Sequence, residues 1–580
     1  MTIVQGRSLA SLAALFTLVA CGGGSSGGTA APPPSTAADA VLSVSLSGGA
    51  SPGIDHLWVT VTGLAMHADA TRVFGDGDPG WIVQTLSTPV TVDLADTSLT
   101  DGGAVSLFKQ SLGTVGSFAQ LRLLVAPSDL ASTLASSASA KGLQFNDQVQ
   151  YTDATGSHVV PLEVPDPQAG LRLLTPFTLS ADTTTPLAIE WDADSLVRRA
   201  SVGADDRFTL RSELHGYNQQ LLTALGDSGL HIDGSIFDSI SGQLDTTNFC
   251  TGASHVGCIH DVVASATSVS SDGRFHAEVR SVNVSATGAF LLYPLPSDPM
   301  YDVVIHGGNM QTMIVRNVVV DPTGLGLVRP FPTALGSPAA PMVPVLDTTE
   351  RPVTLANALV PAGSRVFFGQ TVAGSGSSGV DIPYTIATGA TDPATGQLLH
   401  AVTLPGGPLH YASFDAATDG NGAAPTFATV TPAEGAGAWT VWSQGTLATT
   451  TSAMTTLAAG ASTATVADPV PRAGFATGQL SVTLSGTPSN GADHAELIVS
   501  NDGGVVAVVD VSSQIASHGG TTAISVPTGA SADAPAAAVY GVALRTWAAA
   551  SEATTARWTR AGAPTNMSAT TTASVSLVLP

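Results

Sequence analysis

Four side chains that can bind a metal lie within eleven residues: Cys250, His255, Cys258 and His260. Two thiolates and two imidazoles supply the number and kind of donors that a soft-metal site requires. In an oxidising compartment, however, a pair of cysteines forms a disulfide. The third cysteine, Cys21, is assigned below to a lipid anchor, so Cys250 and Cys258 remain as one pair. We therefore predict a disulfide between Cys250 and Cys258, with the metal site as the alternative.

Two carboxylates with strand spacing form a second group. Asp192 and Asp194 are two positions apart, so on a strand both face the same way and could bind calcium with help from Asp76 or Asp78. The same spacing occurs where a strand ends in a turn, and no Asp-x-Asp-x-Asp-Gly loop is present. Asp192 and Asp194 remain calcium candidates, and no firm metal site and no cofactor is predicted.

The sequence contains no readable catalytic constellation. Residues 75–80 match the consensus sequence of a dinucleotide-binding loop. Such a loop must lead into a helix, however, and Asp78-Pro79-Gly80 cannot begin one. The 13 histidines are scattered, and no serine or aspartate partner for them can be recognised from spacing. We predict that the protein is not an enzyme. The alternative is a secreted hydrolase of polysaccharide or peptide, with the other units as accessories.

The N-terminal residues predict that the protein is localised in the cell envelope. Residues 1–20 have a basic start and a short apolar stretch typical of a signal peptide. The ending Leu-Val-Ala-Cys at 18–21 resembles the bacterial lipobox, which implies that Cys21 becomes the lipidated first residue of the mature protein. Residues 21–40, rich in Gly, Ser and Pro, predict a disordered tether. In the lipoproteins that this ending resembles, Asp after the cysteine marks retention at the inner membrane, so Gly22 implies the outer membrane, on its periplasmic or surface face.

Composition favours a chain built from strands and turns. The 580 residues include 61 Gly and 36 Pro, which argues against helical bundles and coiled coils. Leu42, Val44 and Leu46 alternate with serines, a period-two pattern that recurs between turn residues along the chain. The net charge of −24 argues against a nucleic-acid partner. We predict an all-β chain of tandem antiparallel sandwiches, Ig-like or transthyretin-like, behind the tether.

Two segments carry resemblances to known families. Residues from about 40 to 217 resemble a bacterial domain of unknown function that family catalogues number four thousand three hundred and eighty-two. The segments that carry this resemblance are 57–67, 80–83, 92–94, 116–123, 164–173 and 189–195. The resemblance implies a β-rich domain of secreted lipoproteins that has no established activity. Residues 286–296 and 301–305 resemble the carboxypeptidase-regulatory or transthyretin-like sandwich.

These observations divide the chain into expected units. The expected boundaries are 1–20, 21–40, 41–228, 229–345, 346–470 and 471–580, the last two units resting on faint recurrences of the 286–296 pattern. We expect a non-catalytic envelope protein with a binding, adhesion or structural role. Its partners would be the membrane, through the lipid on Cys21, and an unknown envelope or extracellular ligand.

The lipid anchor gives the first prediction. We expect Cys21→Ser to release the protein from the membrane fraction, because the acyl chains supply about 0.8 kcal/mol per buried CH₂. The measurement is an immunoblot of membrane and soluble fractions of the cell. Unchanged partition of the Cys21→Ser variant would contradict the prediction.

Overall fold

The computed structural model describes residues 39–210, 221–223, 238–320 and 333–580, with short gaps inside these ranges. Cys21, the signal peptide and residues 21–38 of the expected tether lie outside the described residues, and so do Asp192 and Asp194. The expected tether ends too late, because Ala40 is already a buried residue of the first strand. The described residues form strands, with two short helices, α2 (Ser136–Ala140) and α4 (Ser512–Ala516). The expectation of an all-β fold is confirmed.

The first unit, residues 39–223, surrounds one apolar core. Leu42, Val44 and Leu46 of its first strand are fully buried, as their alternation predicts. An eight-stranded sheet has the order β12-β13-β8-β7-β2-β6-β9, with β3 on β2, and a four-stranded sheet has the order β14-β11-β1-β4. The strands are β1 (Ala40–Gly48), β2 (His56–His67), β3 (Ile82–Asp93), β4 (Val105–Leu112), β5 (Gly116–Phe118), β6 (Gln120–Val125), β7 (Gln148–Asp153), β8 (Gly156–Glu163), β9 (Leu171–Leu173), β10 (Phe177–Leu179), β11 (Thr184–Trp191), β12 (Val197–Val202), β13 (Asp205–Leu210) and β14 (Leu221–Thr223).

The middle unit, residues 238–471, is organised by one ten-stranded sheet. Its order is β27-β26-β20-β19-β16-β17-β24-β23-β28-β30, and smaller sheets β18-β15-β21 and β25-β22-β31 accompany it. The strands are β15 (Asp238–Gln243), β16 (His260–Val269), β17 (His276–Asn283), β18 (Ala289–Leu295), β19 (Met300–Gly308), β20 (Met313–Val319), β21 (Thr333–Leu335), β22 (Arg351–Leu355), β23 (Arg365–Gln370), β24 (Tyr384–Ala390), β25 (Val402–Leu404), β26 (Leu409–Ser413), β27 (Ala428–Val430), β28 (Trp439–Gln444), β29 (Ala448–Thr450), β30 (Thr455–Leu457), β31 (Thr463–Ala464) and β32 (Val470–Pro471).

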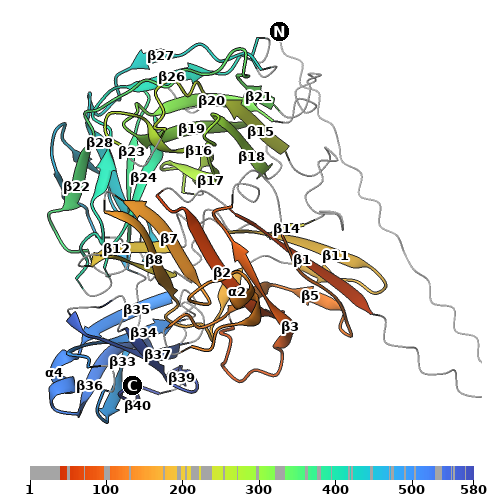
Figure 1. The fold of residues 1–580 in the computed structure, drawn as a ribbon, viewed down its shortest axis with the longest axis vertical. Helices are drawn as coiled ribbons and strands as arrows, with labels where there is room; N and C mark the ends of the chain where they lie inside the picture. Colours follow the sequence, from red (N-terminus) through yellow and green to blue (C-terminus); the bar gives the residue numbers. More distant parts are fainter. Residues whose placement is uncertain are drawn as a thin grey trace, which may run out of the picture.

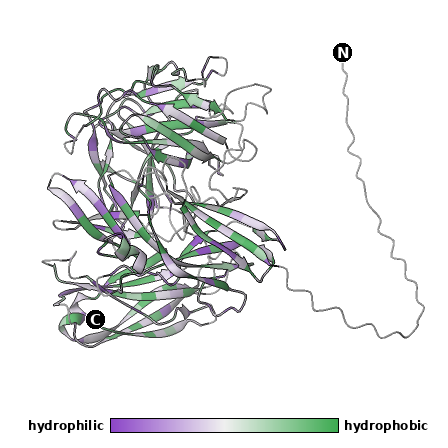
Figure 2. Cartoon of the chain, turned by 45° about the vertical axis from the view of Figure 1, so that its right-hand side comes forward, coloured by the Kyte–Doolittle hydropathy of each residue, from purple (hydrophilic) through white to green (hydrophobic). Residues whose placement is uncertain are grey.

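The last unit, residues 476–580, is a sandwich of two sheets. One has the order β36-β33-β40, and the other has the order β35-β34-β37-β38, with β39 on β37. Figure 2 shows hydrophobic and hydrophilic residues interleaved along the strands of the chain. The strands are β33 (Ala476–Ser485), β34 (His494–Asn501), β35 (Gly504–Asp510), β36 (Gly519–Thr528), β37 (Val539–Trp547), β38 (Arg557–Arg560), β39 (Thr565–Asn566) and β40 (Thr572–Val578).

The structure differs from the expected division at 345/346, because the ten-stranded sheet crosses it. β20 pairs in parallel with β26, and β17 meets β24 at His276 and Tyr384. The reason lies in strand β19, where Val303 and Ile305 face one core while Val304 faces another. A strand that is apolar on both faces needs a layer on each side. The sheet is therefore the centre of three layers, whose outer sheets come from the two expected units.

The last unit packs against the first, although the middle unit separates them in the sequence. In Figure 1 the first unit (red to yellow) lies between the middle unit and the last unit (blue). Glu163 at the end of β8 accepts hydrogen bonds from Arg207 of β13, at 2.8 Å, and from Arg545 of β37, at 2.7 Å. Burial alone would raise the pKa of Glu163, but the two guanidinium groups outweigh it and lower that pKa. Arg560 and Asp129 form a second ion pair, at 3.1 Å, across the same contact.

The shared sheet makes a prediction about fragments. We expect residues 236–472 to unfold cooperatively when expressed alone, because this segment contains all three layers of the middle unit. Residues 229–330 should not, because β19 and β20 would expose Val304 and Ile314 to water. Urea unfolding followed by circular dichroism measures both fragments. A cooperative transition in the 229–330 fragment would contradict the three-layer arrangement.

Candidate functional site

A cavity of about 440 Å³ lies between the first and middle units. The apolar core between the central sheet and the third layer includes no described residue of β16 or β17. Val263, Ser281 and His306 line the cavity from the middle unit. Ile54 and Arg199 line it from the first unit. We call this cavity the inter-unit cleft.

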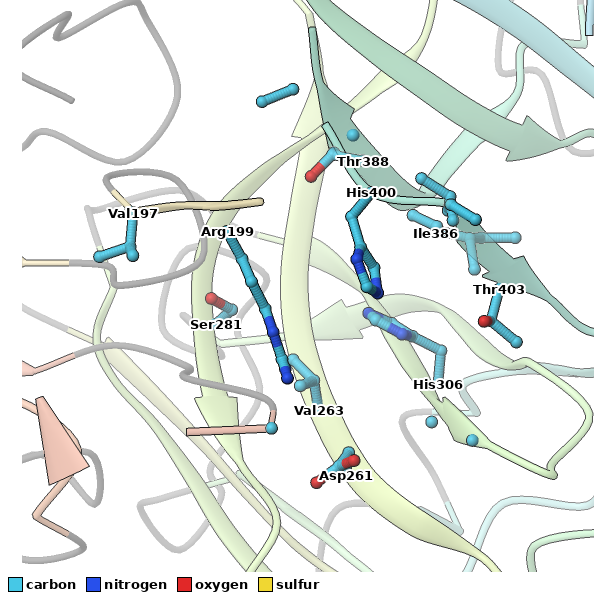
Figure 3. A pocket seen from close by; sticks show the side chains of 18 of the residues that line it. Val197, Arg199, Asp261, Val263, Ser281, His306, Ile386, Thr388, His400 and Thr403 are labelled. Carbon is cyan, nitrogen blue, oxygen red and sulfur yellow. The ribbon is translucent and has the colours of Figure 1, made fainter. Parts of the chain in front are cut away.

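Arg199 of β12 extends into the cleft alongside Val263 (Figure 3). Its Nε donates a hydrogen bond to Asp206 on the neighbouring strand β13. Its guanidinium lies over the rings of Tyr151 and Phe208, with distances of 4.9 and 5.5 Å to the ring centroids. The ion pair and the two rings hold the group in one orientation. The cleft therefore contains a positioned cation on the side of the first unit.

Two histidines of the middle unit face Arg199. Figure 3 shows the imidazoles of His306 and His400 pointing toward one another within the cleft. Burial lowers the pKa of His306 to about 4. Burial, with the charge of Arg199 second, also lowers the pKa of His400. His306 is therefore neutral at pH 7, so its ring offers one hydrogen-bond donor and one acceptor.

Polar groups without partners line the same cleft. Ser281 is 1% exposed, and its hydroxyl has no hydrogen-bond partner among the described residues. The same holds for the hydroxyl of Thr385. Arg365 approaches from β23, where it donates to the hydroxyl of Thr388 at 3.3 Å. Buried hydroxyls of this kind are usually satisfied by water or by a ligand. The cleft can bind a small molecule that carries several polar groups.

A second cluster lies where the cleft meets a neighbouring cavity of about 460 Å³. His255, His260 and Asp261 each offer one ligand atom, and these atoms lie within 4.8 Å of one another. The ring centroids of His255 and His260 are 4.2 Å apart, with the ring planes 17° from parallel. The structure joins Cys250 to Cys258 by a disulfide. Of the four donors singled out in the sequence, the histidines remain available, and Asp261 joins them.

The hydrogen bond between His260 and Asp261 couples their charges. His260 Nδ1 and Asp261 Oδ2 are 2.9 Å apart. That bond raises the pKa of His260, and the charges of Asp261 and Glu350 add to the effect. Burial opposes ionisation of Asp261, but the hydrogen bond from His260, the nearby imidazoles and the Gly53 amide lower its pKa. Asp261 is therefore a carboxylate at neutral pH.

The other residues singled out in the sequence have structural roles where they are described. Asp76 and Asp78 lie in the loop between β2 and β3, where both form ion pairs with Arg72. Asp76 Oδ1 also accepts a hydrogen bond from the indole of Trp81, at 3.2 Å. These carboxylates hold the hairpin loop. The loop that carries them lines a different cavity, which it shares with Pro564 of the last unit.

The comparison with protein families concerns the first unit. Residues 39–212 match the family model described as "Domain of unknown function (DUF4382)". This confirms the resemblance seen in the sequence, and the first unit is called the DUF4382 domain below. No curated protein matches the chain. The resemblance of residues 229–345 to the carboxypeptidase-regulatory sandwich stays a prediction.

Solved structures show only a weak likeness. The Bacillus anthracis TIE protein is 9% identical, with a TM-score of 0.13 over 93% of this chain and 74% of that chain. The Corynebacterium diphtheriae major pilin SpaA is 11% identical, with a TM-score of 0.12 over 59% of this chain and 99% of that chain. Two B repeat units of the Staphylococcus aureus collagen binding protein are 8% identical, with a TM-score of 0.11 over 93% and 99%. TM-scores this low do not indicate a function. Among the described residues, no helix is long and apolar enough to cross a membrane.

The lowered pKa of His306 predicts how stability depends on pH. The unfolded state takes up a proton near pH 6.5, whereas the folded state takes it up near pH 4. The free energy of unfolding should therefore fall as pH falls through this window, by about 2 to 3 kcal/mol from this group. His306→Gln should remove this contribution to the pH dependence of the free energy of unfolding, as measured by urea unfolding at pH 7 and pH 4. His494→Gln, at an exposed histidine, is the control. Equal pH dependence in wild type and His306→Gln would contradict the prediction.

Proposed function

We propose that the protein is a non-catalytic binding protein of the cell envelope, anchored by lipid on Cys21, and that the inter-unit cleft is its ligand site. The observation that carries the proposal is the lining of the cleft. His306 is neutral at pH 7, the Ser281 hydroxyl is buried and has no partner among the described residues, and Asp206 holds Arg199 in place. A volume of about 440 Å³ is in the range of small-molecule sites.

The lining favours a small ligand that has hydroxyl groups and one negative charge, such as a sugar acid. Arg199 and Arg365 both line the cleft and can donate to a carboxylate. The hydroxyls of Ser281 and Thr385 can exchange hydrogen bonds with ligand hydroxyls. Ile54 lies among the residues that line the cleft and offers an apolar surface to the ring of a sugar.

The expected localisation of the protein supports a role outside the cytoplasm. The signal-like residues 1–20, the lipobox ending at Cys21 and the tether of residues 21–40 would hold the folded units away from a membrane. The outer membrane is the favoured destination, since Gly22 follows the cysteine. The disulfide between Cys250 and Cys258 agrees with an oxidising compartment.

One observation favours a second candidate function, a hydrolase. Asp261, Glu278 and Glu350 all line the cleft, and glycosidases use two carboxyl groups on either side of the scissile bond. A general acid, however, needs a raised pKa in order to hold its proton at neutral pH. The pKa of Asp261 is lowered, so this group does not suit that role. Ligand binding is therefore the better-supported function.

Thermal unfolding in the presence of a matched pair of sugars tests the proposal. We expect glucuronate to raise the Tm more than glucose does, because only glucuronate carries the charge that Arg199 and Arg365 would bind. Arg365→Gln should abolish the difference between the two sugars. Arg557→Gln, in β38 of the last unit, is the matched control and should retain it.

Two outcomes would contradict the proposal. One is the absence of any Tm change with either sugar in the wild-type protein. The other is the release of p-nitrophenol from p-nitrophenyl glucuronide at a rate that falls in Asp261→Asn. That second result would assign the cleft to the hydrolase alternative.

A further inference from the structure

We infer that His255, His260 and Asp261 bind a divalent transition-metal cation, for which Zn²⁺ is the appropriate probe. Two imidazoles and one carboxylate are a donor set that zinc accepts in proteins. Their ligand atoms lie within 4.8 Å of one another, so small side-chain rotations bring them onto one ion. This site does not depend on the identity of the ligand in the cleft.

The described residues 255–258 are held at several points. The disulfide ties Cys258 to Cys250. Asn309 Nδ2 donates hydrogen bonds to the carbonyl oxygens of His255, at 2.9 Å, and Cys258, at 3.0 Å. Asn309 is itself held, since its backbone N–H donates to Glu350 at 2.8 Å. A donor whose backbone is held in this way loses little conformational freedom when it binds an ion.

The backbone at Asp261 also places its carboxylate. Asp261 has a φ of +48°, in the left-handed region that residues other than glycine seldom adopt. This conformation stands at the start of β16, directly after His260, and lets neighbouring side chains converge where an extended strand would point them to opposite faces. Backbone strain of this kind is often found at binding sites.

The charges around the cluster favour a cation. Asp261 contributes a carboxylate, and Glu350, which accepts a hydrogen bond from the Asn309 N–H, lines the same cleft. The ring centroids of the two imidazoles are 4.2 Å apart, so a nitrogen of each ring can reach one ion. A metal ion accepts electron pairs from neutral imidazole rings and also neutralises a carboxylate. The cluster therefore places two nitrogen donors and one carboxylate around a single cation position.

The position of the cluster indicates what the ion would do. Asp261 belongs to the middle unit, and the Gly53 amide that hydrogen-bonds it belongs to the DUF4382 domain. A cation on Asp261 would fix this carboxylate at the seam between the two units. The cluster also borders both cavities at the seam, which leaves coordination positions open to water. We expect an exchangeable ion that stiffens the seam.

Isothermal titration of the full-length protein with ZnCl₂ tests the site, with protein prepared without a polyhistidine tag. We expect one Zn²⁺ per chain. His255→Ala and Asp261→Asn should each weaken binding by roughly tenfold or more. Asn at position 261 tolerates the left-handed backbone and keeps an acceptor for Gly53, so the fold should be retained. Near-UV circular dichroism checks that it is.

The chain offers a matched control in the pair Asp493 and His494. These neighbours also form an imidazole–carboxylate contact, at 2.8 Å. The His494 ring, however, packs against Trp547 rather than against a second imidazole. His494→Ala should therefore leave Zn²⁺ binding unchanged. Equal loss in His494→Ala and His255→Ala would mean that binding is a general property of surface histidines, and it would overturn the site.

Two further results would also overturn the assignment. The first is the absence of stoichiometric Zn²⁺ binding by the wild-type protein. The second is unchanged binding in both His255→Ala and Asp261→Asn, together with two free thiols at Cys250 and Cys258 in a non-reducing peptide map. That pair of findings would transfer the metal to the cysteines. In the expected result, the map recovers the two cysteines joined.

Discussion

Glu163 is a charge that the fold removes from water, and the packing of the last unit on the DUF4382 domain depends on how that charge is balanced. Its carboxylate lies between Arg207 of its own unit and Arg545 of β37, with both guanidinium groups in hydrogen-bonding contact. A buried carboxylate left with one partner fewer costs about 3 to 5 kcal/mol. Separating the last unit from the DUF4382 domain would therefore cost free energy, even though the whole middle unit lies between them in the sequence.

The middle unit follows from a different constraint, the apolar character of both faces of β19 and β20. One face is covered by β15, β18 and β21, and the other by β22 and β25. At β16 and β17, Val263 and Ser281 of the second face line a cavity to which the DUF4382 domain contributes Ile54 and Arg199. The inter-unit cleft occupies this position. His306 lies there because it shares the face of Val304, two residues earlier on the same strand.

Part of the candidate site could be read from the sequence. Cys250, His255, Cys258 and His260 stand out because they are close together in the chain, and the disulfide follows from the number of cysteines. Asp261 carries no such signal, since a single carboxylate next to a histidine is common. Arg199, His306 and His400 are more than ninety residues apart at their nearest approach in the sequence. No spacing rule connects them, because strands β12 and β19 and the segment before β25, from two units, bring them together.

By itself, the sequence determined the all-β class, the DUF4382 domain and the strands with one apolar face, such as β1 and β33. Period-two alternation is a local property, and burial of one face follows from it directly. Only the tertiary structure decided that one sheet spans position 345/346 and that the last unit returns to the first. Both depend on which surfaces fit one another. Such contacts join residues hundreds of positions apart, such as Glu163 and Arg545. They therefore produce no periodic pattern in the sequence.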